Sequence, residues 1–125
     1  MRLLRSIGGW AAFGYGVFAV IERASGRYVG NLGLFRMLRE ISGEMLEAPE
    51  AGWIIAEDRW GSGYAGEAMR AVHAWFDKRH GPVRTVCMIV PGNTPSERLA
   101  ARLGYRPFRE GTHKGDLVTL YERRP

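Results

Sequence analysis

The sequence predicts an α/β protein with a mixed β-sheet, and three observations lead to this fold class. Short apolar runs bounded by Gly, Pro or charged residues recur along the chain, as strands do. Two segments instead place their apolar residues at the spacing of amphipathic helices. The order is two strands, then two strand–helix units, then two strands, which is typical of an α/β fold.

The first three strands are predicted over residues 15–22, 28–35 and 51–56, where β-branched and aromatic residues dominate. The first two form a hairpin, because the segment between them, residues 24–27, has the composition of a turn. Residues 36–48 are charged and irregular, so a loop is expected there.

The first helix is predicted from about Gly63 to Arg79 and is ended by Gly81-Pro82. One face of this helix is polar and carries His73 and His80, which are therefore expected in solvent. Its apolar face is formed by residues three and four apart, namely Ala65, Ala68, Met69, Val72, Trp75 and Phe76.

The second helix has a clear start signal. Thr94 is expected as the N-cap, with Pro95 at the first helical position and Glu97 at the third, which together form a capping box. Gly104 is the C-terminal stop signal. Leu99, Ala100 and Leu103 supply the apolar stripe.

The remaining strands are predicted over residues 83–90, 105–109 and 117–123, the last two separated by the turn region 111–115. Cys87 lies in the middle of the first of these strands. We therefore expect a buried, inert thiol there.

Composition limits the class of protein. The 125 residues suffice for one domain, predicted over residues 1–125. No apolar run is long enough to span a bilayer, and a single cysteine fits a reducing compartment, so a cytoplasmic location is expected. The formal charge of +5 suggests an anionic ligand. A basic nucleic-acid-binding module is a weaker interpretation, because no dense basic stripe is present.

The segment Arg59–Met69 carries the main functional signal. It follows a predicted strand and opens a predicted helix, and it contains Gly61 and Gly63. The first amides of a helix lack internal partners, and glycine lets the backbone approach a phosphate closely. We therefore predict that a phosphate-bearing ligand binds at residues 60–65. The alternative is a tight turn that needs glycine only for its backbone conformation.

Two motifs together resemble those of the Gcn5-related N-acetyltransferases, the GNAT family. Trp-Gly-Ser-Gly-Tyr-Ala precedes the first helix, and Pro-Gly-Asn-Thr-Pro-Ser precedes the second, which is followed by Leu-Gly-Tyr. More narrowly, the chain resembles the branch that includes ribosomal-protein alanine N-acetyltransferases. The resemblance covers roughly residues 15–125. It implies the acyl-CoA N-acyltransferase fold, a mixed and mostly antiparallel sheet with flanking helices.

The resemblance also implies which residues bind the cosubstrate, acetyl-CoA; no metal is expected. The loop amides would bind its pyrophosphate, and the strand backbone would pair with its pantetheine arm. Asn93 would match the family's cofactor-contacting asparagine. The expected loop residues are Trp60, Gly61, Ser62, Gly63, Tyr64 and Ala65, and the strand residues are Trp53, Ile54, Ile55 and Ala56.

The implied reaction is direct attack of a primary amine on the thioester, so no enzyme nucleophile is required. Ala100 stands where many members carry a general-acid Tyr, and Ser96 is the candidate for that role in the branch. Ser96 is alternatively a helix first-turn residue that satisfies backbone amides. Glu50, just before the third strand, is the candidate base acting through water, or else an ordinary loop carboxylate. The acceptor is left open between a protein N-terminus, a lysine and a small molecule such as a polyamine or aminoglycoside.

By comparison with the family, a first strand and the helices after it are expected to be missing before Ser6. The strand over residues 15–22 is then expected to be an unpaired edge of the sheet. With the aromatic stretch 8–15, this suggests self-association, for example as a homodimer. A non-catalytic acyl-CoA-binding or structural remnant of the same fold is the alternative function.

Overall fold

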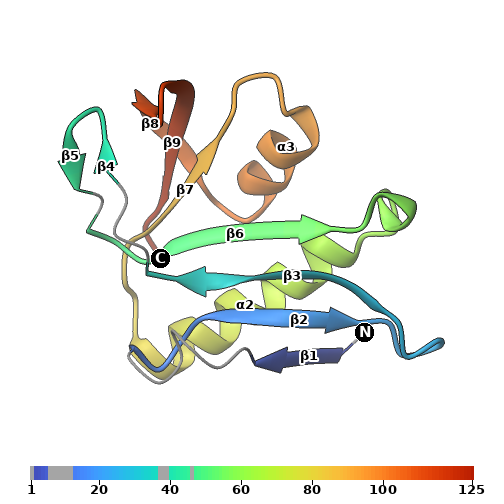
Figure 1. Cartoon of the computed structure of the whole chain (residues 1–125). Coiled ribbons are helices and arrows are strands. Elements are labelled where there is room, and N and C mark those ends of the chain that lie inside the picture. The colour runs from blue at the N-terminus through green and yellow to red at the C-terminus, as the bar shows by residue number, and fades with distance from the viewer. Residues whose placement is uncertain (1, 6–12, 37–39, 46) are drawn as a thin grey trace.

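The computed structural model describes residues 2–5, 13–36, 40–45 and 47–125. The main strands are β1 (Arg2–Arg5), β2 (Val17–Ile21), β3 (Tyr28–Phe35), β6 (Glu50–Ile55), β7 (Thr85–Ile89), β8 (Arg106–His113) and β9 (Asp116–Arg123). They form one sheet in the order β1-β2-β3-β6-β7-β9-β8 (Figure 1). Every neighbouring pair is antiparallel except β6–β7. The prediction of a mixed, mostly antiparallel sheet is confirmed.

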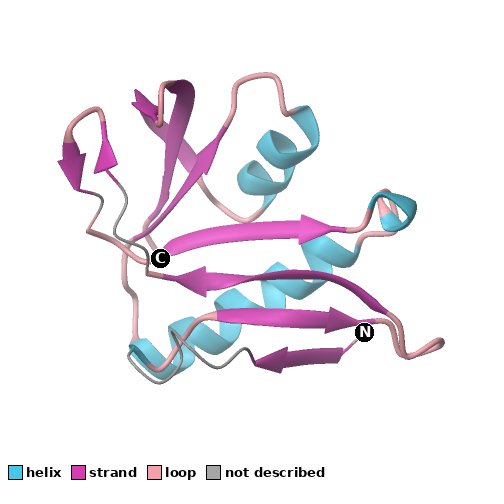
Figure 2. Cartoon of the chain, viewed as in Figure 1, coloured by secondary structure: helices cyan, strands magenta, loops and turns pink. Residues whose placement is uncertain are grey.

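Within the described residues, two helices flank this sheet, α2 (Tyr64–His80) and α3 (Thr94–Arg102), and a short 3-10 helix, η1 (Glu57–Arg59), precedes α2. Helix α2 crosses behind β2, β3 and β6, whereas α3 lies beside β7 (Figure 2). The predicted apolar face of α2 is the one that packs on the sheet. Ala68, Met69, Val72 and Phe76 are all buried. In the described part of the chain, no helix has the length and apolarity needed to cross a membrane.

The parallel pair β6–β7 divides the sheet into two halves. Their register contains only Glu50 opposite Val86, next to a bond from the Val86 N–H to the Pro49 carbonyl at 3.0 Å. Beyond this point the two strands diverge (Figure 1). On its other side, β6 pairs with β3 along its whole length, from Glu50 to Ile55. The sheet is therefore continuous at one end of β6 and forked at the other.

Two expectations about the sheet are wrong. β2 is not an unpaired edge, because all four residues of β1 pair with it. Self-association therefore cannot be argued from a bare β2 edge, and most of the aromatic stretch 8–15 lies outside the described residues. The expected loop over residues 36–48 contains a small hairpin, β4 (Glu40–Ile41) and β5 (Glu44–Met45). Ile41 anchors this hairpin, because its side chain is only 2% exposed.

The expectation that His73 is solvated is also wrong, because its side chain is 3% exposed. Its Nδ1 lies 2.7 Å from the Met69 carbonyl, which can only accept, so Nδ1 carries the proton. Nε2 then accepts from the Tyr105 hydroxyl at 2.8 Å, and that oxygen lies 2.8 Å from the Thr85 hydroxyl. This buried chain of hydrogen bonds links α2, β7 and the start of β8. A neutral His73 satisfies every member of it.

His80 is not fully solvated either. It is partly buried, and its ring lies against the rings of Tyr15, Trp75 and Phe76. The last turn of α2 therefore belongs to an aromatic cluster beneath the start of β2. The polar face predicted from the sequence of α2 is therefore narrower in the structure, because other parts of the fold cover both histidines.

Acid should destabilise the fold through His73. Burial lowers the pKa of this histidine below its ordinary value of 6.5, so on acidification the unfolded chain takes up a proton before the folded chain does. Stability is full above about pH 6.5 and falls below it, by at most about 1.4 kcal/mol per pH unit from this residue. Urea unfolding at several pH values from about 7.5 to about 5.5 measures how the free energy of unfolding changes with pH.

The matched variant is His73→Gln, which keeps a hydrogen-bonding side chain without a titrating ring. Its stability should depend less on pH over the same range. An equal slope in the two proteins would contradict the role of His73.

Candidate functional site

A cavity of about 590 Å³ lies in the fork between β6 and β7. Its walls come from five segments: the start of β2, the middle and end of β3, most of β6, the second half of β7 and the start of α3. Ile54 and Val90 stand on opposite sides of the fork, 69% and 57% exposed. Large apolar side chains held open to solvent in a cavity wall are suited to contact a ligand.

The backbone of β6 faces this cavity along one edge. β3 covers the other edge, and the register with β7 ends at Glu50. An extended ligand in the fork can therefore pair with β6 as an added strand. Of the four residues predicted to do so, Trp53 and Ile54 line the cavity. The Ala56 N–H already donates to the Val29 carbonyl at 2.7 Å, and its carbonyl accepts from the Arg59 N–H at 2.9 Å, so a ligand at that residue would be a second donor to the carbonyl.

The glycine loop follows β6 beyond the open end of the fork. Gly61 and Gly63 both have a φ of 78°, a left-handed conformation that other residues adopt at a cost. Gly63 is the N-cap of α2, and no side chain caps the helix there. Trp60 is fixed to the preceding strand, because its indole Nε1 donates to the Ile55 carbonyl at 2.7 Å. The first amides of α2 thus remain available to an anion.

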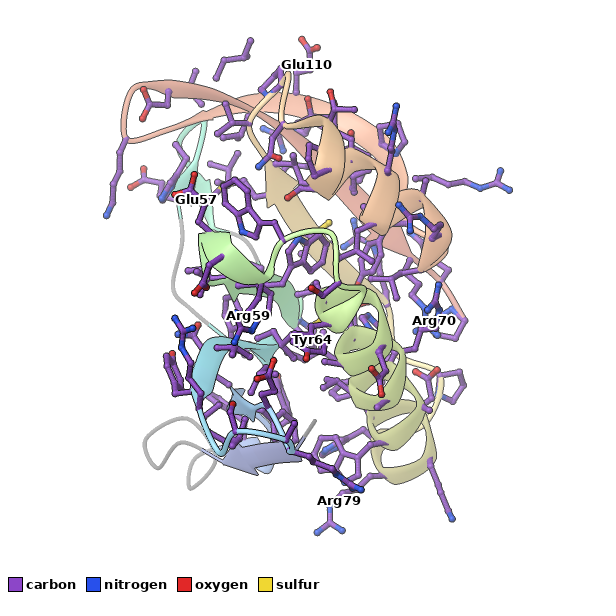
Figure 3. All side chains as sticks on the ribbon, turned by 90° about the vertical axis from the view of Figure 1, so that its right-hand side faces the viewer. Glu57, Arg59, Tyr64, Arg70, Arg79 and Glu110 are labelled. Atoms are coloured by element: carbon purple, nitrogen blue, oxygen red, sulfur yellow. The ribbon has the colours of Figure 1, made fainter. Side chains whose placement is uncertain are left out.

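Both flanks of this loop are tied to Glu22, a residue that sequence analysis missed. On one flank, Arg59 donates to the Glu22 carboxylate from Nε at 2.8 Å and from Nη2 at 3.3 Å. On the other flank, the Tyr64 hydroxyl donates to the same carboxylate at 2.7 Å. Ser25 adds a fourth bond at 2.7 Å from the turn between β2 and β3. Figure 3 shows Arg59 and Tyr64 side by side where the chain enters α2.

The start of α3 differs from the prediction by one residue. The N-cap is Asn93, whose Oδ1 accepts from the Ser96 N–H at 3.4 Å, so the predicted Thr94 capping box is wrong. Thr94 is instead the first helical residue, and its hydroxyl lies 3.5 Å from the Gly92 carbonyl. Since the oxygen of Asn93 is used in the cap, its side-chain NH₂ is the group left to contact a ligand.

Ser96 bridges the two walls of the fork. Its hydroxyl oxygen accepts from the Trp53 indole Nε1 at 3.2 Å, and both residues line the cavity. Because the indole can only donate, the hydroxyl proton of Ser96 is free to point elsewhere. A hydroxyl that accepts one hydrogen bond also donates more strongly, since neighbouring bonds polarise one another.

Glu50 lies at the closed end of the fork. It is 4% exposed, and it lines the cavity together with Cys87 of β7. Burial, with a smaller effect from Glu50, raises the pKa of Cys87 to about 12. The thiol is therefore protonated and unreactive, as expected for a buried structural cysteine.

The cavity brings together five of the predicted site residues: Glu50, Trp53, Ile54, Asn93 and Ser96. The loop residues 60–65 do not line it but follow β6 past its open end. The arrangement is that of an elongated site, with a carboxylate at the closed end, a hydroxyl at the α3 wall and free amides beyond the rim. Among the residues with described placement, no group of three His, Cys, Asp or Glu side chains could hold a metal ion.

Comparisons of the sequence and of the structure with known proteins lead to the same family. Residues 2–106 match the family model of the acetyltransferase (GNAT) domain. The protein YkkB of Bacillus subtilis, itself uncharacterised, is 30% identical over 115 residues. That match includes 89% of this chain and 63% of YkkB, so the chain spans less than two thirds of that relative's length.

Solved structures agree. One from Bordetella pertussis, described as a GNAT-family acetyltransferase, superposes with a TM-score of 0.85 at 35% identity, covering 91% of this chain and 68% of that one. The ribosomal-protein-S5-alanine acetyltransferase of Vibrio fischeri superposes with a TM-score of 0.74, covering 88% of this chain and 61% of that one. At 17% identity, the second likeness shows a shared fold alone.

Because Asn93 and not Thr94 caps α3, alanine substitutions at these two adjacent residues should differ in their effect on stability. Asn93→Ala removes the side chain that caps the helix and should lower the free energy of unfolding by about 1 kcal/mol. Thr94→Ala removes only an exposed hydroxyl and should cost a few tenths of that. Urea unfolding of the two variants beside the wild type measures both values. A larger loss in Thr94→Ala than in Asn93→Ala would restore Thr94 as the cap.

Proposed function

The chain belongs to the GNAT acetyltransferase family, and we propose that it transfers an acetyl group from acetyl-CoA to a primary amine by direct attack. Acetyl-CoA is the usual acetyl donor of the family. The observation that carries the proposal is the fork: an open β6 edge that leads from a cavity to a glycine loop with free amides. Under this proposal, residues 1–125 act as one acetyltransferase domain.

The proposed pose follows the shape of the donor. The pantetheine arm lies in the fork against the edge of β6, over residues 53–56. The arm extends along β6 so that the pyrophosphate reaches amides of the Trp60–Ala65 loop, where the dipole of α2 favours negative charge. The side-chain NH₂ of Asn93 contacts the donor from the opposite wall. The thioester then lies near Ser96, within the cavity.

In the reaction, the amine nitrogen forms a bond to the thioester carbonyl carbon, and the carbon–sulfur bond breaks. The amine loses a proton, and the departing thiolate gains one. No enzyme nucleophile takes part, which agrees with the raised pKa of Cys87. Holding the two reactants together supplies much of the rate, on the order of 7–11 kcal/mol at best.

Two residues have proposed proton roles. Ser96 donates its hydroxyl proton to the departing thiolate and regains a proton from water. The bond from Trp53 supports this role, because it leaves the hydroxyl proton free and polarises it. Glu50 receives the proton of the amine, through water, from its position in the cavity wall. A carboxylate and a hydroxyl on different walls of one cavity suit the two opposite proton transfers.

The proposal is tested by calorimetry with acetyl-CoA, followed by an assay of thiol release over a panel of amines. The panel contains a peptide that begins with alanine, a lysine peptide, spermidine and an aminoglycoside. Binding with turnover of one amine supports the proposal. Binding without turnover of any supports the second candidate, a non-catalytic acyl-CoA-binding protein. Absence of binding contradicts both.

The glycine loop gives the first variant. Gly63→Val should weaken acetyl-CoA binding at least about tenfold, near 1.4 kcal/mol, because the side chain keeps the phosphate from the amides. Gly115→Val is the matched control. Gly115 has a similar φ of 84°, and at both positions an added Cβ meets open space, so both variants carry similar backbone strain. Calorimetry that shows equal, unchanged affinity in both folded variants would place the phosphate elsewhere.

Ser96 gives the second variant. Ser96→Ala should lower kcat by about 10²-fold, the low end for a general acid, and leave acetyl-CoA affinity nearly intact. Helix α3 should persist, because Asn93 caps it through its own side chain. Thr94→Ala, which removes a nearby hydroxyl, should keep the wild-type kcat. If Ser96→Ala also keeps it, Ser96 is structural and water supplies the proton.

A further inference from the structure

We infer that Glu22 is a positioning residue for the acetyl donor: its carboxylate holds both flanks of the glycine loop and so fixes the loop amides in place for the diphosphate. This inference rests on the proposed function, and it assigns a role to a residue in neither of the motifs. Glu22 follows β2 directly and does not line the cavity. It acts on the donor only through Arg59 and Tyr64.

Within the loop, Trp60 is held by its indole bond to Ile55, and the N–H groups of Trp60 and Ser62 donate to the carbonyls of Glu57 and Arg59 at 3.1 and 3.4 Å. The two glycines, in contrast, lie in open space. A Cβ built on Gly61 or Gly63 meets no atom within 4 Å, and both residues, like Ser62, are exposed. Glycine at a positive φ is also the residue with the most conformational freedom to lose. Holding the flanks on either side of the two glycines reduces the conformational freedom that the loop would lose on binding, and with it the loss of affinity.

Glu22 holds both flanks at once. Arg59 is the last residue of η1 and Tyr64 is the first of α2, so only the four loop residues 60–63 lie between the two anchors. Both donate to the same carboxylate oxygen, Oε2 of Glu22. The distance between the loop's flanks is therefore set by one acceptor, which directly follows β2. Bonds to a charged acceptor are the stronger class of hydrogen bond.

The cluster stays charged under ordinary conditions. The bonds from Arg59, then Tyr64 and Ser25, lower the pKa of Glu22 to about 2. The carboxylate therefore remains ionised at any pH at which the protein would be assayed. The side chains of Glu22 and Arg59 are 14% and 26% exposed, so the pair is largely sheltered from solvent. Arg59 is thereby committed to Glu22. Phosphate is left to the amides of the loop and the first turn of α2 other than those of Trp60 and Ser62, which donate to the Glu57 and Arg59 carbonyls.

The test uses three variants of the full chain. Glu22→Gln keeps the shape of the side chain and removes its charge, and Tyr64→Phe removes one anchoring hydroxyl. Ser25→Ala is the matched control, because it also loses one bond to Glu22 but lies outside the loop. Calorimetry should show acetyl-CoA binding weakened about tenfold in the first two, the loss expected for one bond to a charged group. Ser25→Ala should bind like the wild type.

A second readout separates positioning from general damage. An acetyl donor without phosphates, such as S-acetyl-N-acetylcysteamine, cannot use the loop. With this donor, Glu22→Gln should keep the wild-type kcat/KM, whereas with acetyl-CoA it should lose it about tenfold, in parallel with the affinity. Equal losses with both donors would overturn the inference, because the damage would then not concern the phosphates.

Other outcomes are equally decisive. Unchanged acetyl-CoA affinity in both Glu22→Gln and Tyr64→Phe would overturn the inference while the proposed function stands. Tighter binding by Glu22→Gln would also overturn it, since a released Arg59 would then be the better phosphate ligand. A wild-type chain that does not bind acetyl-CoA would overturn the proposed function together with the inference.

Discussion

The structure depends on a single parallel contact, the pairing of β6 with β7 through Glu50 and Val86. Each of the two strands has an antiparallel partner on its other side, β3 for β6 and β9 for β7, so each half of the sheet is complete without further pairing at the fork. The two halves are therefore free to diverge, and the edge of β6 opens to a cavity that no side chain needs to fill. A full parallel ladder at this point would close that edge and remove the cavity.

The cavity persists only if β6 and β7 are each held in place from the side that faces away from it. On one side, β6 is held by β3 along its length and by α2 behind it; on the other, β7 is held by β9. The Trp53–Ser96 hydrogen bond connects the two walls within the cavity. The buried chain His73–Tyr105–Thr85 connects them outside it, joining α2 to β7. The geometry of the site is thus set by one contact within the cavity and by others outside it.

Local patterns account for what could be predicted. The periodicity of α2 identified its buried face at Met69 and Phe76, and glycines between a strand and a helix identified the loop. The α3 cap was misassigned because Asn93 and Thr94 both satisfy the same local rule, and only geometry decides between them. Glu22, His73 and β1 were missed for a different reason. The bonds of Glu22 to Arg59 and Tyr64 span 37 and 42 residues, that of His73 to Tyr105 spans 32, and four residues of β1 are too short a pattern.

In the structure, several of the positively charged residues have a structural role. A formal charge of +5 first suggests cations aimed at an anionic ligand. Three arginines instead join separate elements: Arg59 pairs with Glu22 at 2.8 Å, Arg84 with Glu122 at 2.7 Å and Arg123 with Asp77 at 2.8 Å. The arginine nearest the glycine loop is one of them. In the proposed site, oriented backbone amides and the dipole of α2 therefore supply attraction for phosphate that Arg59 does not, and its strength depends on how well the loop is held.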